Sequence, residues 1–166
     1  TRLGIPIVIN TDAHHTDGLL AADAEWVLER CARQKERPFF VAVGFFRPHT
    51  PYVAPKAPYF DYYPEPEMPV VTGVKEDQAD LPAAALGSYK QEQDKLTDDL
   101  RRQAVQAYYA SISFMDAQVG RVVAALDRLG LADHTVIVFT SDHGYHLGEH
   151  GLWQKRSLFE ESARVP

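Results

Sequence analysis

The chain has 166 residues, of which 45% are hydrophobic and 24% are charged, and its formal net charge is −6. This composition is typical of a globular chain that buries a core, and it excludes intrinsic disorder. The balance of 17 Lys and Arg against 23 Asp and Glu argues against bulk nucleic-acid binding, although a few local cations can still hold an anionic substrate. One cysteine cannot form an intrachain disulfide, and no apolar run reaches the ~18 residues of a transmembrane helix.

The first predicted elements are a short strand and a helix. Residues 5–9 form an apolar run with a proline, which predicts an edge strand at best, and His14 and His15 are predicted to be solvated in the turn that follows. Residues 18–36 predict a helix that Thr16 or Asp17 can cap. Its apolar face comprises Leu20, Ala24, Val27 and Cys31.

Two continuous apolar runs predict buried strands of a parallel sheet. They are residues 38–44 and residues 135–140. Between them, residues 98–129 predict a long helix that starts after Thr97 and ends before Gly130. Its predicted apolar stripe comprises Leu100, Ala104, Tyr108, Ile112, Met115, Val119, Val122, Leu126 and Leu129. The order strand, helix, strand implies a right-handed βαβ crossover, so we expect an α/β fold with a mostly parallel sheet flanked by helices.

Two further segments complete the chain. Residues 61–95 are rich in Pro, Asp, Glu and Ala and show weak periodicity, which predicts a surface excursion with one short helical turn. Long excursions of this kind are often functional. Residues 157–160 read Ser-Leu-Phe-Glu, a capping box that predicts a last helix extending to about residue 164.

The polar loops that follow the two apolar runs carry the candidate site. Because ligands bind at the carboxyl ends of the strands in open α/β sheets, we expect the loops at residues 45–56 and 141–156 to lie near each other. They would place around one edge Arg47, His49, Asp142, His143, His146, His150, Lys155 and Arg156.

The chemistry of single residues in these loops leaves alternatives open. The pair Asp142-His143 can supply two ligands to a metal such as zinc or manganese, or it can be a capped turn with a surface histidine. The rigid prolines around His49 suit a general acid or an anion contact, and equally a histidine that fills a corner. Lys155 is either a solvated cation or a fixed charge for an oxyanion. His146 and His150 are predicted to serve loop packing, because the glycines around them oppose a helix.

Three motifs in order resemble the type I sulfatases, and most closely their iduronate-2-sulfatase-like branch. They are Phe-Phe-Val-Ala-Val-Gly-Phe-Phe-Arg-Pro-His-Thr-Pro at 39–51, Tyr-Tyr-Ala-Ser-Ile-Ser-Phe-Met-Asp-Ala-Gln-Val-Gly at 108–120, and Phe-Thr-Ser-Asp-His-Gly at 139–144, the last followed by Leu-Gly-Glu-His-Gly and Trp-Gln-Lys. The resemblance covers about residues 17–60 and 97–166. It implies the alkaline-phosphatase-like α/β fold and hydrolysis of sulfate esters by a formylglycine next to a calcium ion.

By position in these motifs, the resemblance assigns roles to five residues. Asp142 and His143 would be ligands of one Ca²⁺, which the resemblance favours over zinc. His49 and Lys155 would contact the sulfate and take part in catalysis, with the histidine protonating the leaving oxygen, and Arg47 would lie beside them as a substrate-binding residue. The expected substrate is a sulfate-ester small molecule or glycan, and the expected location is an exported one: periplasmic, lysosomal or extracellular.

The departures from the family pattern predict an internal fragment. The formylglycine precursor motif Cys-x-Pro-x-Arg is absent, because Cys31 is followed by Ala-Arg-Gln-Lys, and a first pair of metal-binding aspartates is absent too. We therefore expect residues 1–166 to be the central part of a catalytic domain, without nucleophile and inactive alone. Two alternatives stay open: a phosphatase or phosphonate hydrolase of the same superfamily, and a non-catalytic module that binds sulfated glycans through Arg47, His49, Lys155 and Arg156. Specificity is expected in the variable loops at 1–16 and 61–95.

Overall fold

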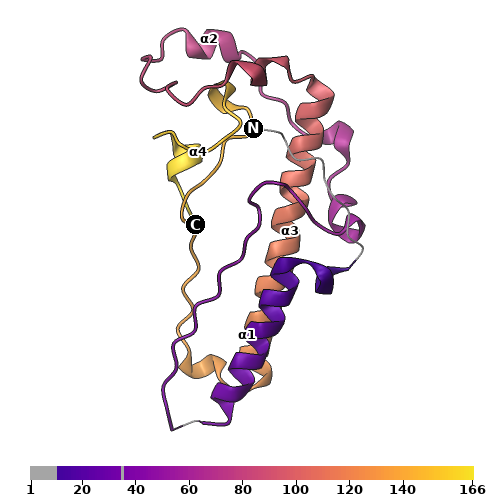
Figure 1. Cartoon of the computed structure of the whole chain (residues 1–166), viewed down its shortest axis with the longest axis vertical. Coiled ribbons are helices and arrows are strands. Elements are labelled where there is room, and N and C mark those ends of the chain that lie inside the picture. Colours follow the sequence, from indigo (N-terminus) through magenta and orange to yellow (C-terminus); the bar gives the residue numbers. More distant parts are fainter. Residues whose placement is uncertain (1–10, 35) are drawn as a thin grey trace. The chain divides into compact units, whose positions relative to one another are not determined.

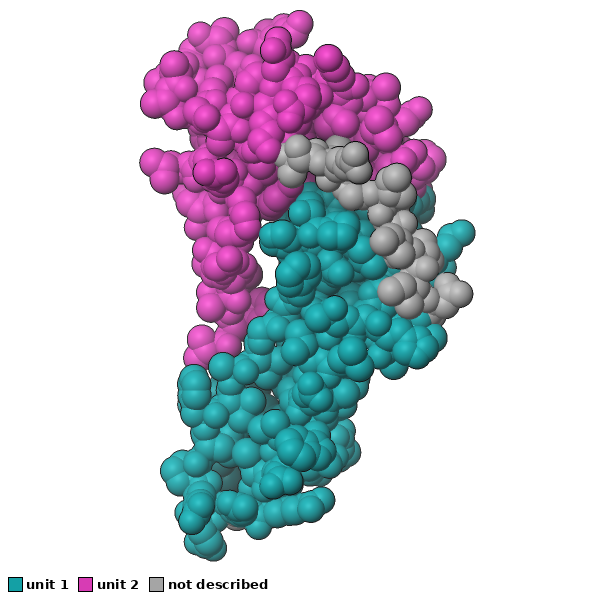
Figure 2. Space-filling view, in the orientation of Figure 1, with its two compact units in different colours: residues 1–64, 106–137 teal, residues 65–105, 138–166 magenta. Residues whose placement is uncertain are grey.

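The structure is a computed structural model that describes residues 11–34 and 36–166, so the edge strand predicted at residues 5–9 lies outside the described residues. The chain divides into two compact units, each made of two separate stretches of sequence (Figure 2). Unit 1 comprises residues 1–64 and 106–137, and unit 2 comprises residues 65–105 and 138–166.

Unit 1 is built on the packing of two helices, α1 (Thr16–Ala32) and the part of α3 (Asp98–Arg128) from residue 106 onward. Figure 1 shows α1 lying along the C-terminal part of α3. Leu28 of α1 forms a buried cluster there with Ala125 and Leu126 of α3. A second cluster surrounds the fully buried ring of Phe114 and includes Ala54, Tyr59 and Ala110.

The start, end and buried face of α1 differ from the prediction. The helix begins two residues earlier and ends four residues earlier, and neither Thr16 nor Asp17 caps it, because His15 occupies the N-cap without a side-chain bond. Its buried apolar residues are Ala21, Ala24 and Leu28, so the predicted stripe is wrong except at Ala24. The small alanines allow close packing on α3, which a pattern of large apolar residues does not reveal.

The long helix α3 is confirmed together with both of its ends. The amide of Leu100 donates to Thr97 Oγ1 at 3.3 Å, which is the predicted N-cap bond. At the other end Gly130 has φ 65°, and the Leu131 amide donates to the Leu126 carbonyl at 2.9 Å in a Schellman arrangement. The predicted stripe is only partly right, since Leu100 is exposed. The buried line of the helix comprises Ala104, Val105, Ala107, Ala110, Ser111, Phe114, Gln118, Ala125 and Leu126.

The two predicted strands are extended segments without strand pairing among the residues that the structure describes. In the first, Phe39 and Val41 pack against the Leu28 cluster while Phe40 is 93% exposed, which is the two-residue alternation of a strand with one covered face. In the second, Val136 is 91% exposed. The backbone N–H and C=O groups of a buried strand need hydrogen-bond partners, which neighbouring strands supply. Because no such pairing is present among the described residues, the parallel sheet and the βαβ crossover stay a prediction.

Unit 2 contains the part of α3 up to residue 105, together with short helical elements joined by loops. The excursion at residues 61–95 contains three of them, Glu65–Glu67, α2 (Val74–Gln78) and Gln91–Lys95, where one helical turn was predicted. The predicted last helix is reduced to α4 (Glu160–Ala163), and its N-cap residue makes no side-chain bond, so the predicted capping box is wrong. No helix in the described part of the chain is long and apolar enough to cross a membrane.

Candidate active site

The loop that carries His49 lies in unit 1 and is held at its start by Asp17. This aspartate sits in the first turn of α1 and is 1% exposed. Its Oδ1 accepts the Phe46 amide at 2.8 Å, and its Oδ2 accepts the Arg47 amide at 2.9 Å. The sequence suggested Asp17 only as a helix cap, whereas its carboxylate serves a segment about 30 residues away.

The side chain of Arg47 forms hydrogen bonds within the same loop. Its Nη1 donates to the carbonyl oxygens of His49 at 3.0 Å and of Pro51 at 2.6 Å. Burial lowers the pKa of Arg47, and the nearby charge of Asp17 opposes that shift. The guanidinium therefore shapes the loop, and the substrate-binding role expected for Arg47 stays a prediction.

The imidazole of His49 is exposed and has one nitrogen engaged. Nδ1 lies 2.8 Å from the carbonyl oxygen of Thr50, and the ring lies 5.1 Å from the ring of Phe46, tilted by 45°. Because a carbonyl only accepts, Nδ1 carries the proton in the neutral ring, and Nε2 is left for a ligand.

Asp142 and His143 in unit 2 form an arrangement that suits two ligands of one cation. His143 Nδ1 lies 2.7 Å from the carbonyl of Gly144, so the lone pair of the neutral ring is on Nε2. That Nε2 faces Asp142 Oδ2 at 3.5 Å. Two ligands at right angles, each about 2.4 Å from a calcium ion, lie about 3.4 Å apart. The pair therefore fits one edge of a metal coordination sphere.

The environment of Asp142 keeps it ionised. Desolvation is the largest single contribution and acts to raise its pKa, but the positive charge that His143 carries when protonated, the Ser141 hydroxyl and backbone hydrogen bonds together outweigh it, so the pKa lies below the usual value. Its side chain is 85% exposed, so the carboxylate is open to a further partner. Within the described ranges no group of three or more His, Cys, Asp or Glu residues is arranged to hold a metal ion, so calcium binding by this pair stays a prediction.

Lys155 follows a hairpin-like loop at residues 144–154. The His146 amide donates to the Gln154 carbonyl at 3.0 Å, and the Gly148 amide donates to the Leu152 carbonyl at 2.9 Å. The turn between them relies on the positive φ of Gly148, at 119°. Lys155 is half-buried just after this loop, and no hydrogen bond or ion pair of its ammonium occurs among the described residues.

The excursion at residues 61–95 supports the segment that leads to Lys155. The carbonyl of Trp153 accepts Gln93 Nε2 at 3.2 Å and the Tyr145 hydroxyl at 3.0 Å, and Gln154 Nε2 donates to the carbonyl of Ser88. Gln93 is buried, which sequence analysis did not foresee in a stretch rich in charged and proline residues. The excursion at residues 61–95 therefore supports the segment that precedes Lys155.

Buried histidines reinforce this loop, and one of them corrects a prediction elsewhere. His146 is fully buried with its Nε2 2.7 Å from Ser157 Oγ, and His150 Nδ1 lies 2.8 Å from Asp77 Oδ2 of α2. Both confirm the predicted packing role. The Ser157 hydroxyl is used by His146, which explains why it caps no helix. In unit 1, by contrast, the predicted solvation of His15 is wrong, because His15 is buried against the ring of Phe114.

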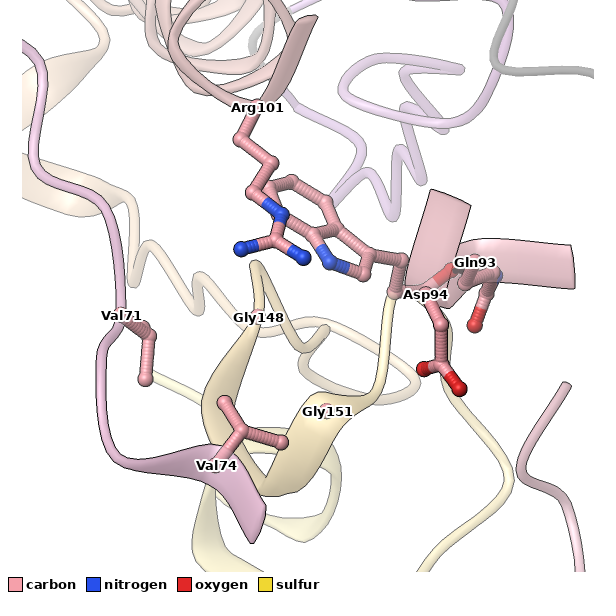
Figure 3. A pocket seen from close by; sticks show the side chains of 8 residues that line it. Val71, Val74, Gln93, Asp94, Arg101, Gly148 and Gly151 are labelled. Atoms are coloured by element: carbon pink, nitrogen blue, oxygen red, sulfur yellow. Dashed lines mark hydrogen bonds between the residues drawn. The ribbon is translucent and has the colours of Figure 1, made fainter. Parts of the chain in front are cut away.

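A small cavity of about 30 Å³ lies in unit 2 behind the same loop (Figure 3). It has room for about one or two water molecules. Figure 3 shows the Arg101 side chain on one side of this cavity and Gln93 and Asp94 on another. The cavity is lined by Val71, Val74, Gln93, Asp94, Arg101, Gly148, Gly151 and Trp153.

The predicted site residues thus fall in two sets. Asp142 and His143 are adjacent, and Lys155 belongs to the same unit. Arg47 and His49 belong to unit 1. The expectation that all five meet at one sheet edge stays a prediction.

Comparison with known proteins decides the family. The sulfatase family model matches residues 8–166. The chain belongs to the sulfatase family. It is 39% identical over 151 residues to iduronate 2-sulfatase of Homo sapiens, with 78% of this chain and 26% of that protein covered. It is 38% identical over 136 residues to choline-sulfatase of Rhizobium meliloti, with 80% and 26% covered.

A solved structure supports the fold of this sulfatase chain. The crystal structure of phosphonate monoester hydrolase of Agrobacterium radiobacter matches with a TM-score of 0.80 and 27% identity, covering 98% of this chain and 34% of that one. The chain therefore shares the fold of part of that hydrolase. It spans about a quarter of the length of the curated relatives above.

Replacing Gly148 with alanine should destabilise unit 2. Its φ of 119° is rarely adopted by residues with a side chain, and a Cβ there would lie 3.2 Å from the Trp153 ring. We expect Gly148→Ala to lower the free energy of unfolding by about 1–3 kcal/mol, measured by urea denaturation. Gly120→Ala in the middle of α3, where a Cβ meets nothing within 4 Å, should instead be stabilising by about 0.5–1 kcal/mol. Equal effects of the two variants would contradict this account.

Acidification should destabilise unit 2 through His146. Burial lowers the pKa of His146, while Glu161 and Glu149 act to raise it and His150 acts to lower it. The unfolded chain therefore takes up a proton first, so the contribution of His146 is complete above about pH 6.5 and is lost as the pH falls from there through the lower pKa of the folded state. Thermal unfolding of wild type and His146→Gln at about pH 7.5 and about pH 5.5 checks this. The wild type should lose more stability on acidification than the variant, and an equal loss would refute the assignment.

Proposed function

We propose that the complete protein carrying this chain is a formylglycine- and calcium-dependent sulfuric ester hydrolase that acts on a sulfated saccharide or a similar ester. Membership of the sulfatase family supports the reaction class. The metal proposal rests on the distance of 3.5 Å between His143 Nε2 and Asp142 Oδ2. The other ring nitrogen of His143, Nδ1, is hydrogen-bonded to the carbonyl of Gly144, which leaves Nε2 for a metal ion. We further propose that the protein is exported.

The proposed roles follow from which atoms are left for a ligand. Asp142 and His143 would hold calcium, and when bound the ion would polarise the sulfuryl oxygens. In the imidazolium form of His49, Nε2 would hold the proton that goes to the leaving oxygen, while the Nδ1 proton stays engaged by the carbonyl of Thr50. Lys155 is a half-buried residue that follows the loop at residues 144–154. Its ammonium would neutralise negative charge that develops on the sulfate.

One second candidate is favoured by a specific observation. The fold match to a phosphonate monoester hydrolase supports the hydrolysis of phosphonate or phosphate esters by the same architecture. A non-catalytic module for sulfated glycans has less support, because the Arg47 guanidinium that would bind the glycan is bonded to two carbonyls of its own loop.

Calcium dependence tests the proposed function. We expect the complete protein to release inorganic sulfate from an aryl sulfate, to lose activity on chelation, and to regain it with calcium. In Asp142→Asn, the calcium concentration that restores half of the activity should rise by about 10–100-fold. Asp133→Asn, which changes an exposed aspartate of unit 1, should behave like wild type. Activity that survives chelation would contradict the metal assignment. The 166-residue chain alone is expected to release no sulfate, and release by it would contradict the proposed need for a separate nucleophile segment.

A further inference from the structure

We infer that Asp17 is a positioning residue that fixes the orientation of the His49 imidazole. This inference rests on the proposed function in so far as it concerns catalysis, but its structural part concerns unit 1 alone. The starting point is that Asp17 is a carboxylate with only 1% of its surface exposed. Burying a carboxylate is costly unless its oxygens are satisfied, so the partners of the two oxygens indicate what the residue does.

Both oxygens of Asp17 are used by the start of the His49 loop. One accepts the amide of Phe46 at 2.8 Å and the other accepts the amide of Arg47 at 2.9 Å. Hydrogen bonds to an ionised acceptor are about twice as strong as neutral ones, and the position in the first turn of α1 adds the favourable helix dipole. The carboxylate thereby fixes two consecutive peptide units.

The two residues that Asp17 holds both contact His49. The ring of Phe46 lies 5.1 Å from the His49 ring, and Arg47 Nη1 donates to the His49 carbonyl at 3.0 Å. The side chain of Phe46 thus bounds one side of the imidazole, and Arg47 fixes the backbone that bears it. Movement of either peptide unit would shift the ring and its Nδ1 contact with Thr50.

A neighbouring aspartate provides the contrast that makes this role specific. Asp12 accepts the Tyr59 hydroxyl at 2.6 Å and Gln118 Nε2 at 2.9 Å, which are groups of the Phe114 core and of α3. Asp12 therefore supports the helical core of the same unit, and among the described residues its side chain bonds to Tyr59 and Gln118 and not to the His49 loop. Removing Asp12 should cost stability without disturbing the imidazole.

Nuclear magnetic resonance of the 166-residue chain tests the structural part. In wild type, scalar couplings across the hydrogen bonds should link the Asp17 carboxyl carbon to the Phe46 and Arg47 amide nitrogens, and His49 should be the Nδ1–H tautomer when neutral. In Asp17→Asn, exchange protection of one of these amides should fall about tenfold or more, and the tautomer preference of His49 should weaken. Asp12→Asn should retain both signatures. Missing couplings in wild type, or equal changes in the two variants, would overturn the inference, and the wild-type couplings remain decisive if Asp17→Asn does not fold.

Kinetics of the complete protein test the catalytic part separately. With an aryl sulfate, Asp17→Asn should lower kcat by about tenfold or more and leave KM within about twofold, because the proton donor is displaced while binding elsewhere persists. Asp17→Glu should recover part of kcat, which a purely destabilising change would not do. A wild type without sulfatase activity would refute the proposed function and leave the spectroscopic result standing. Unchanged kcat in Asp17→Asn, in an active protein, would overturn the positioning role.

Discussion

His49→Ala in the complete protein is expected to lower kcat for an aryl sulfate by about 10²–10⁴-fold, the usual range for the loss of a general acid. The imidazole is exposed, its Nδ1 is held by the Thr50 carbonyl, and its Nε2 is the atom available to a leaving oxygen. An imidazolium whose ring orientation and backbone are already fixed loses little conformational entropy when it donates from Nε2. Steady-state kinetics with leaving groups of different acidity measure the effect.

The choice of leaving group provides the control for this prediction. A good leaving group, such as a nitrophenolate, needs little protonation, so the defect of His49→Ala should shrink as the leaving-group pKa falls. His134→Ala, which replaces an exposed histidine outside the candidate loops, should leave kcat unchanged. A defect of equal size for good and poor leaving groups would show that His49 does not donate the proton.

Phe114→Ala is expected to lower the free energy of unfolding by about 3–5 kcal/mol, the usual cost of deleting a fully buried aromatic ring. The ring has no exposed surface and lies 5.0 Å from the ring of His15 and 5.5 Å from that of Tyr59. The cavity left behind cannot collapse easily, because helix α3 holds its backbone on both sides. Domains of this size have only about 5–15 kcal/mol of stability, so the loss should be visible at room temperature.

Urea denaturation of the 166-residue chain, followed by circular dichroism, measures this loss. Leu158→Ala is the matched control, since Leu158 is 99% exposed and its truncation should change the free energy by less than about 0.5 kcal/mol. A loss below about 1 kcal/mol for Phe114→Ala would mean that the Phe114 cluster is not the core of unit 1.

The long helix α3 was the part of the fold that the sequence predicted well, because the signals at its two ends are local. The cap at Thr97 and the left-handed Gly130 both appear as predicted, since each depends on residues within one turn. The buried faces were predicted less well, because Ser111 and Gln118 are fully buried polar residues that an apolar stripe omits. The strands at 38–44 and 135–140 show why pairing is the harder problem, since an apolar run does not identify the segment that completes its backbone hydrogen bonds.

The candidate site residues were proposed from motifs, whereas the residues that support their loops were not predicted. Arg47, His49, Asp142, His143 and Lys155 are all chemically distinctive residues in the loops after predicted strands. Asp17 and Gln93 form hydrogen bonds to backbone groups 29 and 60 residues away along the chain. The periodicity of apolar residues in a sequence does not predict long-range polar contacts of this kind. A signal was nevertheless present at Asp17, because an aspartate at a helix start that makes no cap bond needs another partner.

Competition between two esters in the complete protein tests the central claim most directly. The values of kcat/KM for a sulfate monoester and for a phosphonate monoester with the same aryl leaving group isolate the choice of the transferred group. A sulfatase with Lys155 and a calcium ion on the sulfuryl oxygens should prefer the sulfate ester by about tenfold or more. A preference of that size for the phosphonate ester would contradict the proposal and assign the chain to the phosphonate hydrolases whose fold it shares.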